Sequence, residues 1–302
     1  MPIPRRLQRR AFAVTAAGAL GLGASRLRGA DIDRPFHGVR SIGIDLRELR
    51  GRCRAYLPRM RGPEVFSHST AALLYEIPLP AELEAAPTLH VSSTDDGRPR
   101  AVGVTGHRIK RMLRRDDRGL PLASPADTWC QLATQLSLDD LIAAGDAFVS
   151  GRLVARGFRV APLCTRDELR AAIGRHRPAR GTAKLGEALE HVRTGVDSRR
   201  ETHTRLTIVR SGLPEPVIAA PVVVLGGVVL HPDLSYPELK IAIEYEGEEH
   251  RLDAARWRDD IARRRALESA GWIVIRVTIA DLRAPGGFLA DIRAHRRRRL
   301  AH

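Results

Sequence analysis

Three acidic residues in the last third of the chain have the spacing of a metal-binding site. Glu244 and Glu246 lie two residues apart in residues 239–247, where apolar and polar side chains alternate as in a β-strand. Their side chains therefore point to one face, and Asp233, at the end of a preceding strand-like segment, can converge on them. Clustered carboxylates repel one another and are costly to hold together without a cation. The pattern indicates a site for Mg²⁺, with Mn²⁺ as the alternative.

His250 adds a group that can transfer protons at the same end of the strand. It lies four residues beyond Glu246, past a turn at Gly247. Its imidazole can act as a general base or bind a leaving oxygen. The same run of residues is also typical of an exposed acidic turn, and the acidic pattern taken alone leaves both interpretations open.

The elements around these residues decide between the two interpretations. Asp197 and Ser198 are N-cap candidates for a helix over 197–211, which places Glu201 in its first turn. A two-glycine turn at 226–227 separates two short strands. The remaining expected elements are the strand over 239–247, a helix over 252–270 and a strand over 272–277. Helix, strand, hairpin turn, strand, helix and strand follow in the order of a restriction-endonuclease core.

Four motifs carry a family resemblance across residues 197–282. They read S-R-R-E, P-D, I-A-I-E-Y-E-G-E-E-H and D-I-A-R-R-R-A-L-E-S-A-G-W-I-V-I-R-V-T. This part of the chain resembles the endonuclease-like domain related to the very-short-patch-repair (Vsr) mismatch endonucleases, which has the PD-(D/E)XK fold. The resemblance implies metal ligands at Asp233 and Glu244. It implies catalytic roles for Glu201, Asp233, Glu244, Glu246 and His250, and nucleic-acid contacts at Arg263 and Arg276.

Glu246 departs from the pattern of that family. The position usually carries Asp there and Lys in classical nucleases, and a glutamate cannot position an attacking water as a lysine does. Tyr236, Pro237 and Glu238 also interrupt the join between the strands that carry Asp233 and Glu244. The first departure bears on the activity that the resemblance implies, and the second on the alignment of Asp233 with Glu244.

The N-terminal residues 5–40 have the pattern of a small helix-turn-helix. Phe12, Ala16, Ala19 and Leu20 lie at helical spacing, glycines at 21–23 make a turn, and Ser25 caps a second short helix. Residues 32–40 are expected to form a wing-like hairpin. The alternative interpretation is a helical packing unit without a ligand.

A weaker resemblance covers the first 150 residues. The motifs are F-x-x-x-x-A-x-x-x-G at Phe12, then R-P-F-H-G-V-R, S-P-A-D-T-W and L-I-A-A-G-D-A-F. They resemble the abortive-infection type IV antitoxin (AbiEi-like) family, whose N-terminal winged-helix domain binds DNA. The expected fold class is α/β: a winged-helix-like DNA-contacting module over 1–62, an AbiEi-like α+β connecting region over 63–180, and a PD-(D/E)XK domain over 181–302.

The connecting region holds three histidines. Strands are expected at 89–92 and 102–107, and Ser124 with Pro125 is expected to begin a helix. His68, His90 and His107 lie more than fifteen residues apart. These spacings match no ligand pattern, so the sequence argues against a metal site there.

Charge and cysteine content narrow the class of partner. The formal net charge is +15, which favours nucleic acid over a membrane surface, although the surplus is almost all arginine. Three widely spaced cysteines indicate neither a disulfide framework nor a zinc site. Arg9-Arg10 before an apolar stretch is also the start of a twin-arginine signal, but glycines interrupt the stretch and arginines follow it. A cytoplasmic location is expected.

Two functions remain open from the sequence. The first is a Mg²⁺-dependent endonuclease that hydrolyses phosphodiester bonds, with DNA as its partner. The second is a DNA-binding, antitoxin-like regulator in which an inactive nuclease fold serves as a platform. A toxin partner and a second copy of the chain are the other partners considered, and no membrane partner is expected.

Overall fold

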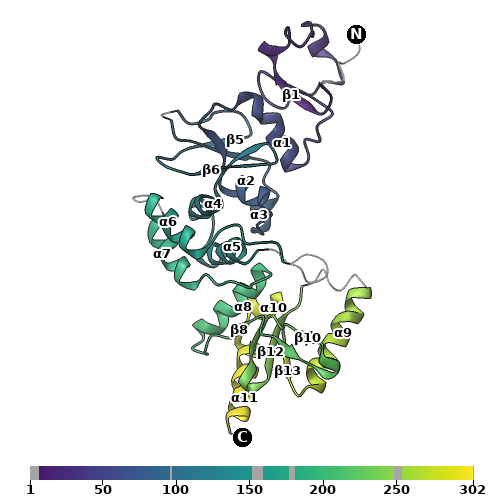
Figure 1. The fold of residues 1–302 in the computed structure, drawn as a ribbon, viewed down its shortest axis with the longest axis vertical. Helices are drawn as coiled ribbons and strands as arrows, with labels where there is room; N and C mark the ends of the chain where they lie inside the picture. Colours follow the sequence, from purple (N-terminus) through teal and green to yellow (C-terminus); the bar gives the residue numbers. More distant parts are fainter. Residues whose placement is uncertain (1–6, 96, 152–158, 177–180, 248–253, 302) are drawn as a thin grey trace. The chain divides into compact units, whose positions relative to one another are not determined.

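The computed structural model describes residues 7–95, 97–151, 159–176, 181–247 and 254–301, with the backbone alone for 254–259. The chain forms two compact units (Figure 1). Unit 1 comprises Met1–Leu136 and Cys164–Glu187, and unit 2 comprises Ser137–Leu163 and Ala188–His302. Part of the expected connecting region 63–180 therefore belongs to unit 2. Helices and mixed sheets occur together, which agrees with the expected α/β class at that level.

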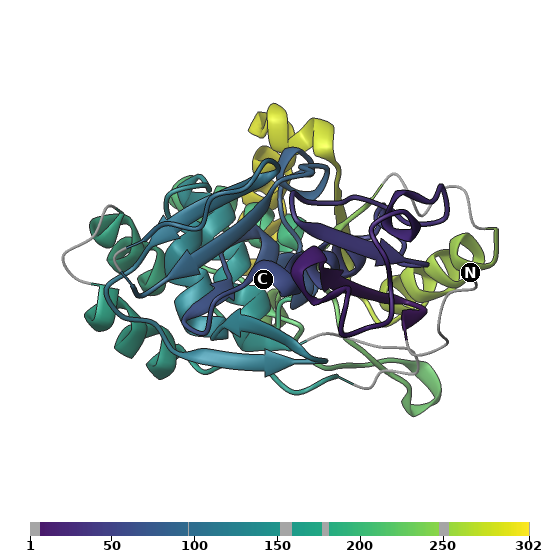
Figure 2. The ribbon, with the colours of Figure 1, turned by 90° about the horizontal axis from the view of Figure 1, so that it is seen from above.

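The N-terminal segment of unit 1 is built on a β-ribbon. Strand β1 (Arg10–Ala13) pairs antiparallel with β2 (Val39–Ile42), as the view from above also shows (Figure 2). Between them lie two single 3₁₀ turns, Val14–Ala16 and Arg26–Arg28. The helix expected through Phe12 and Leu20 is therefore wrong, and the DNA-contacting role of this module stays a prediction.

The packing explains why the helical spacing misled. The buried side chains of this segment recur at every fifth residue from 12 to 32, a spacing that fits neither helix nor strand. They are Phe12, Ala17, Leu22, Leu27 and Ile32, together with Leu7 and Ile42. Gly21 has a φ of 78°, which ends the local turn. The wing-like hairpin expected over 32–40 is present only as a single antiparallel bridge between Asp33 and Ser41, and the strand β2 pairs with β1.

A five-stranded mixed sheet forms the centre of unit 1, in the order β5-β4-β3-β7-β6. Its strands are β3 (Glu64–Phe66), β4 (Leu89–Ser93), β5 (Val104–Arg108), β6 (Arg114–Asp117) and β7 (Leu120–Ala123). The expected strands at 89–92 and 102–107 are confirmed as β4 and β5, which are parallel neighbours. Strand β6 (R-R-D-D) was not predicted, because it lacks the apolar alternation by which strands are found in a sequence.

Helices pack on this sheet and on one another. They are α1 (Leu49–Tyr56), α2 (His68–Leu74), α3 (Ala81–Glu84), α4 (Pro125–Leu132) and α6 (Arg166–His176), followed by α7 (Thr182–His191), which spans the division between the units. Helix α2 packs on β4 and on α4 (Figure 1). Ser124 caps α4 by accepting a hydrogen bond from the Asp127 amide, as predicted. Arg175 and His176 of α6 pair with the buried Asp127 carboxylate, which joins α6 to α4.

Unit 2 is built on a four-stranded sheet in the order β13-β12-β11-β8. Its strands are β8 (Val217–Ile218), β11 (Leu234–Tyr236), β12 (Ile241–Tyr245) and β13 (Ile273–Val277). The first three are antiparallel neighbours, and α9 (Ala254–Ser269) connects β12 to its parallel neighbour β13. The expected helices over 197–211 and 252–270 and the expected strands over 239–247 and 272–277 are thus confirmed, but β8 and β11 were not predicted. The hairpin β9 (Val222–Val223) and β10 (Val229–Leu230) forms a sheet of its own.

The other helices of unit 2 are α5 (Leu138–Ser150), α8 (Arg199–Arg210), α10 (Ile279–Arg283) and α11 (Gly286–Leu300). The alternation in β12 divides the core as expected. Ile241 and Ile243 pack with residues of α8 and α11 on one face, whereas Ala242 packs with Leu267 of α9 on the other. Helices thus cover both faces of the sheet. No helix among the described residues is both long and apolar enough to cross a membrane.

Candidate functional site

Asp233 and Glu244 face each other at one end of the sheet of unit 2. Leu234 pairs with Ile243, and continuing this register by one residue sets Asp233 opposite Glu244 on the same face. The Tyr245 amide donates a hydrogen bond of 2.9 Å to Oδ2 of Asp233. The convergence of these two carboxylates, expected from the sequence, is thus present.

The position of Asp233 along the strands differs from the expectation. Strand β10 ends at Leu230, and Asp233 precedes β11 instead of ending the strand before it. Pro237–Leu239 forms a 3₁₀ turn that joins β11 to β12. The segment at Tyr236 that was expected to interrupt the join is therefore part of a tight hairpin. Leu234 and Tyr236 are buried on the face of Ile241 and Ile243, and this shared burial fixes the register.

Glu201 brings a third carboxylate to this site from the first turn of α8. Ser198 caps the helix by accepting a hydrogen bond from the Glu201 amide, and Oε2 of Glu201 accepts one from the Asp197 amide. Burial raises the pKa of Glu201, whose exposed fraction is only 8%. The pKa of Asp233 is raised well above its usual range by burial and then by the charge of Glu201, with a smaller contribution from Glu244. The three residues therefore form one electrostatic cluster, which we call the acidic site.

Both arginines that were assigned to nucleic acid pair with carboxylates here. Arg263 of α9 donates from Nε to Oε1 of Glu244 at 3.1 Å, and it also bonds the His231 carbonyl. Arg276 of β13 forms an ion pair with Glu246. Their contact with phosphate stays a prediction. His250 lies outside the described residues, so its role also stays a prediction.

The acidic site fits Mg²⁺ by donor type and charge. Carboxylate oxygens are the ligands that Mg²⁺ prefers, and a cation would relieve the repulsion that raises the pKa of Asp233. The distances between these carboxylate oxygens fit a metal ion less closely than their chemistry does. Within the described part of the chain, three metal-ligating atoms all within 4.8 Å of one another occur only at His68, His90 and His107.

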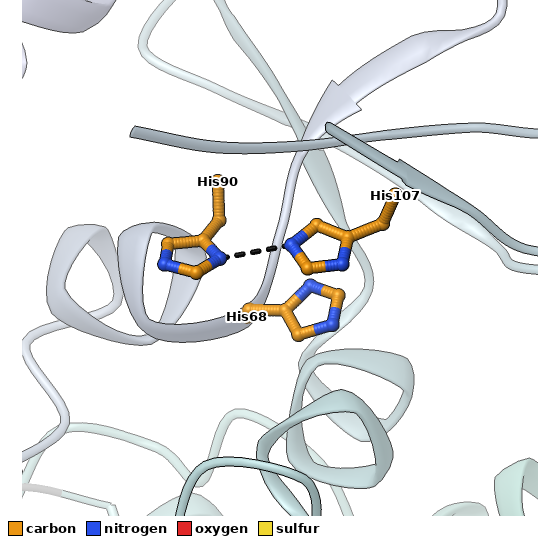
Figure 3. A group of neighbouring side chains, drawn as sticks. All are labelled: His68, His90 and His107. Atoms are coloured by element: carbon orange, nitrogen blue, oxygen red, sulfur yellow. Dashed lines mark hydrogen bonds between the residues drawn. The ribbon is translucent and has the colours of Figure 1, made fainter. Parts of the chain in front are cut away.

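That histidine cluster is the group that the sequence analysis set aside. His90 of β4 and His107 of β5 lie on one face of neighbouring parallel strands, since His90 pairs with Thr105 and Ser92 with His107. Nδ1 of His90 is 2.9 Å from Nε2 of His107 (Figure 3). His68, from the start of α2, stacks on His107 with ring centroids 3.7 Å apart.

Burial lowers the pKa of all three imidazoles. The pKa of His107 falls to about 4 through burial, assisted by His90 and Arg98, and that of His90 is lowered by burial. The pKa of His68 is lowered well below its usual value by burial and then by its two neighbours. The cluster was missed because strand register, which no sequence spacing reveals, brings these residues together. The only sequence signal is that each lies within, or at the start of, a regular element.

Comparison with known proteins places the chain beside two proteins of Mycobacterium tuberculosis. They are "Uncharacterized protein MT2308" of strain CDC 1551 / Oshkosh and "Uncharacterized protein Rv2248" of strain ATCC 25618 / H37Rv. Each is 30% identical over 253 residues, which cover 82% of this chain and 87% of the relative. No family model and no solved structure matches the chain. The chain therefore belongs to the same protein family as these two mycobacterial proteins.

Proposed function

We propose that unit 2 is a Mg²⁺-dependent endonuclease domain of the PD-(D/E)XK type and that DNA is its substrate. The observation that carries the proposal is the acidic site, in which Asp233 and Glu244 face each other beside the buried Glu201. The order of elements supports it. Helix α8, strands β8, β11 and β12, helix α9 and strand β13 follow in the order that the resemblance implies for a restriction-endonuclease core.

In this proposal the three carboxylates have different tasks. Asp233 and Glu244 hold the cation through their oxygens. When bound there, Mg²⁺ supplies a Lewis acid for the scissile phosphate and lowers the pKa of a bound water. Glu201 accepts and donates protons, because burial raises the pKa of its carboxyl group. Its Oε2 accepts the Asp197 N–H, so Oε1 is the oxygen left to carry a proton.

The charge of the chain supports a polyanionic substrate. A net charge of +15 provides affinity for phosphates that depends on salt and not on sequence. Any preference for a base sequence or a DNA structure must then come from other contacts. The N-terminal segment is the proposed source of those contacts.

The test is cleavage of supercoiled plasmid and of mismatched duplex by the purified chain with Mg²⁺ or Mn²⁺. We expect nicking by the wild type and its loss in Asp233→Asn and in Glu244→Gln, which remove charge and preserve shape. Asp260→Asn is the matched control, because Asp260 is an exposed carboxylate on α9 of the same unit. Equal nicking in all four proteins would point to a contaminating nuclease and overturn the assignment.

A second function is favoured by the ion pairs in and beside the acidic site. Arg263 pairs with Glu244 and Arg276 with Glu246, so part of the negative charge is compensated without a metal. Glu246 also replaces the residue that positions water in classical nucleases. This alternative is an antitoxin-like DNA-binding regulator, with a toxin protein or a second copy of the chain as partner. It predicts DNA binding without metal and no calorimetric signal when Mg²⁺ or Mn²⁺ is added.

A further inference from the structure

The histidine cluster of unit 1 is separate from the acidic site and has no task in the proposed nuclease reaction. Its three imidazoles come from three elements, α2, β4 and β5, and their ligand atoms all lie within 4.8 Å of one another. Figure 3 shows the His90 and His107 rings directed edge to edge, with His68 beneath them. Three nitrogens from three elements at this spacing are the donor set of a transition-metal site.

The surrounding hydrogen bonds hold the rings in place. Nδ1 of His68 is 3.0 Å from Oγ of Ser67, which accepts a 2.7 Å hydrogen bond from Oγ of Ser92. The His90 amide donates to Oγ1 of Thr70 at 2.8 Å and so fixes β4 against α2. Partners of this kind orient metal-binding histidines and select the nitrogen that remains available.

The backbone at His68 is also constrained. Its φ of 52° lies in the left-handed region, which is costly for a residue with a side chain. The His68 amide donates to Oε1 of the buried Gln131 at 3.0 Å, and Nε2 of Gln131 has no hydrogen-bond partner among the described residues. Strain that the surroundings maintain in this way is typical of functional positions.

We propose that His68, His90 and His107 bind one divalent transition-metal ion, with Zn²⁺ as the leading candidate. His90 binds through Nδ1 and His107 through Nε2, the two atoms that face each other. His68 contributes one ring nitrogen from beneath them (Figure 3). Imidazole nitrogens favour Zn²⁺ over Mg²⁺. Three protein ligands leave the fourth position to water or to another small ligand, as in zinc sites that do chemistry.

Binding requires one hydrogen to move and the stacked His68 and His107 rings to turn, because a metal ion lies in the plane of each imidazole that binds it. The hydrogen shared by Nδ1 of His90 and Nε2 of His107 leaves that position, and the neutral His90 ring then carries its hydrogen on Nε2. Nε2 of His90 lies 3.3 Å from the amide nitrogen of Gln135, whose Oε1 accepts from the Ser69 amide. A carboxylate at position 135 can accept hydrogen bonds from both Nε2 of His90 and the Ser69 amide. Gln135→Glu should therefore bind Zn²⁺ more tightly, by about tenfold, the lower end of second-shell effects.

The experiment uses the full chain, stripped with a chelator and titrated calorimetrically with Zn²⁺. We expect one ion per chain for the wild type and for His37→Ala, which removes an exposed histidine of unit 1. His90→Asn and His107→Asn should weaken binding by more than about 100-fold, since even second-shell partners contribute about 10- to 100-fold. Circular dichroism without metal verifies that the variants fold, and Co²⁺ absorption bands that vanish in the same two variants show direct coordination.

Zn²⁺ also binds carboxylates, so the titration is repeated with the double variant Asp233→Asn/Glu244→Gln. Retention of the ion in that protein assigns it to the histidines. Absent binding in the wild type, equal binding in His90→Asn and His107→Asn, or loss of the ion from the acidic-site variant would each overturn the proposal. Weaker binding in Gln135→Glu would overturn the choice of Nδ1 as the donor of His90.

Discussion

The acidic site of unit 2 and the histidine cluster of unit 1 are built in opposite ways. Asp233 and Glu244 come from one hairpin, so twelve residues of chain contain both and their positions follow from strand alternation. His68, His90 and His107 come from one helix and two strands. They meet only because β4 and β5 are parallel neighbours and α2 packs on β4. A site made by local chain geometry can be found from spacing, whereas a site made by tertiary pairing cannot.

The charges in the two sites are also handled differently. The acidic site gathers groups that repel when ionised, and arginines compensate part of their charge. The histidine cluster gathers groups that burial keeps neutral. Carboxylates and neutral imidazoles suit different cations, hard Mg²⁺ in the first site and Zn²⁺ in the second. The two proposed metal sites are therefore independent, and each can be disproved without the other.

The largest expected effect is that a variant of each site loses one property, either nicking or Zn²⁺ binding, and keeps the other. Asp233→Asn should lower Mg²⁺-dependent nicking by at least about 100-fold, since a lost metal ligand costs several kcal/mol in the transition state. It should leave Zn²⁺ binding unchanged. His107→Asn should abolish Zn²⁺ binding and leave nicking unchanged. Parallel nicking assays and Zn²⁺ titrations of both variants check this, and a variant that loses both properties would show that the sites are coupled.

Asp127→Asn should give the next largest effect, on stability. The buried Asp127 carboxylate bonds Arg175 and His176 and accepts from the Leu113 amide. Removing one partner of a buried ion pair costs about 3–5 kcal/mol, so we expect a loss at the lower end of this range. The measurement is urea unfolding at pH 7. Asp167→Asn is the control, because its pair with Arg170 is exposed and should contribute less than about 1 kcal/mol.

The lowered pKa of Asp127 predicts that unit 1 loses stability in acid. Burial alone would raise the pKa of Asp127, but hydrogen bonds from His176, Ser124, the Leu113 amide and Arg175 lower it to about 2. A carboxylate with a lowered pKa stabilises the folded state fully above its unfolded pKa, and this contribution is lost as pH falls toward 2. The wild type should lose stability faster than Asp127→Asn over that interval.

The fold was predictable where periodicity was strong and local. Helices α8 and α9 and strands β12 and β13 followed from strand alternation, a Ser198 cap and the stop at Gly271, whereas the very short strands β8 and β11 did not. The N-terminal ribbon was not predictable, because its buried residues recur every five positions and its strands pair across residues 13–39. Strand β6 was hidden by its charge. For the candidate site, the convergence of Asp233 and Glu244 was predictable, but the ion pairs of Arg263 and Arg276 were not, since they depend on how α9 and β13 lie beside β12.

Arg263→Gln distinguishes the nuclease from the regulator through a smaller effect, a change in the affinity for Mg²⁺. The guanidinium competes with a cation for Glu244 in a partly exposed pair. Such pairs contribute roughly 0.2–1 kcal/mol, so its removal should tighten Mg²⁺ binding by up to about fivefold if Glu244 is a ligand. Calorimetric titration with Mg²⁺ measures this. Arg264→Gln, which removes an exposed pair with Glu268 on the same helix, is the control.

The smallest expected effects are changes of stability with pH in metal-free protein, which should be opposite in sign for the two sites. The raised pKa values of Asp233 and Glu201 mean that the folded state binds more protons than the unfolded state, so stability should rise as pH falls from 8 toward 5. The lowered pKa of His107, about 4, means that the unfolded state binds more protons below pH 6.5, so stability should fall over the lower part of the same interval. Urea midpoints of Glu201→Gln and His107→Asn against pH, each subtracted from wild type, should therefore differ in sign. Slopes of the same sign would show that one of the two sites does not carry the charges assigned to it.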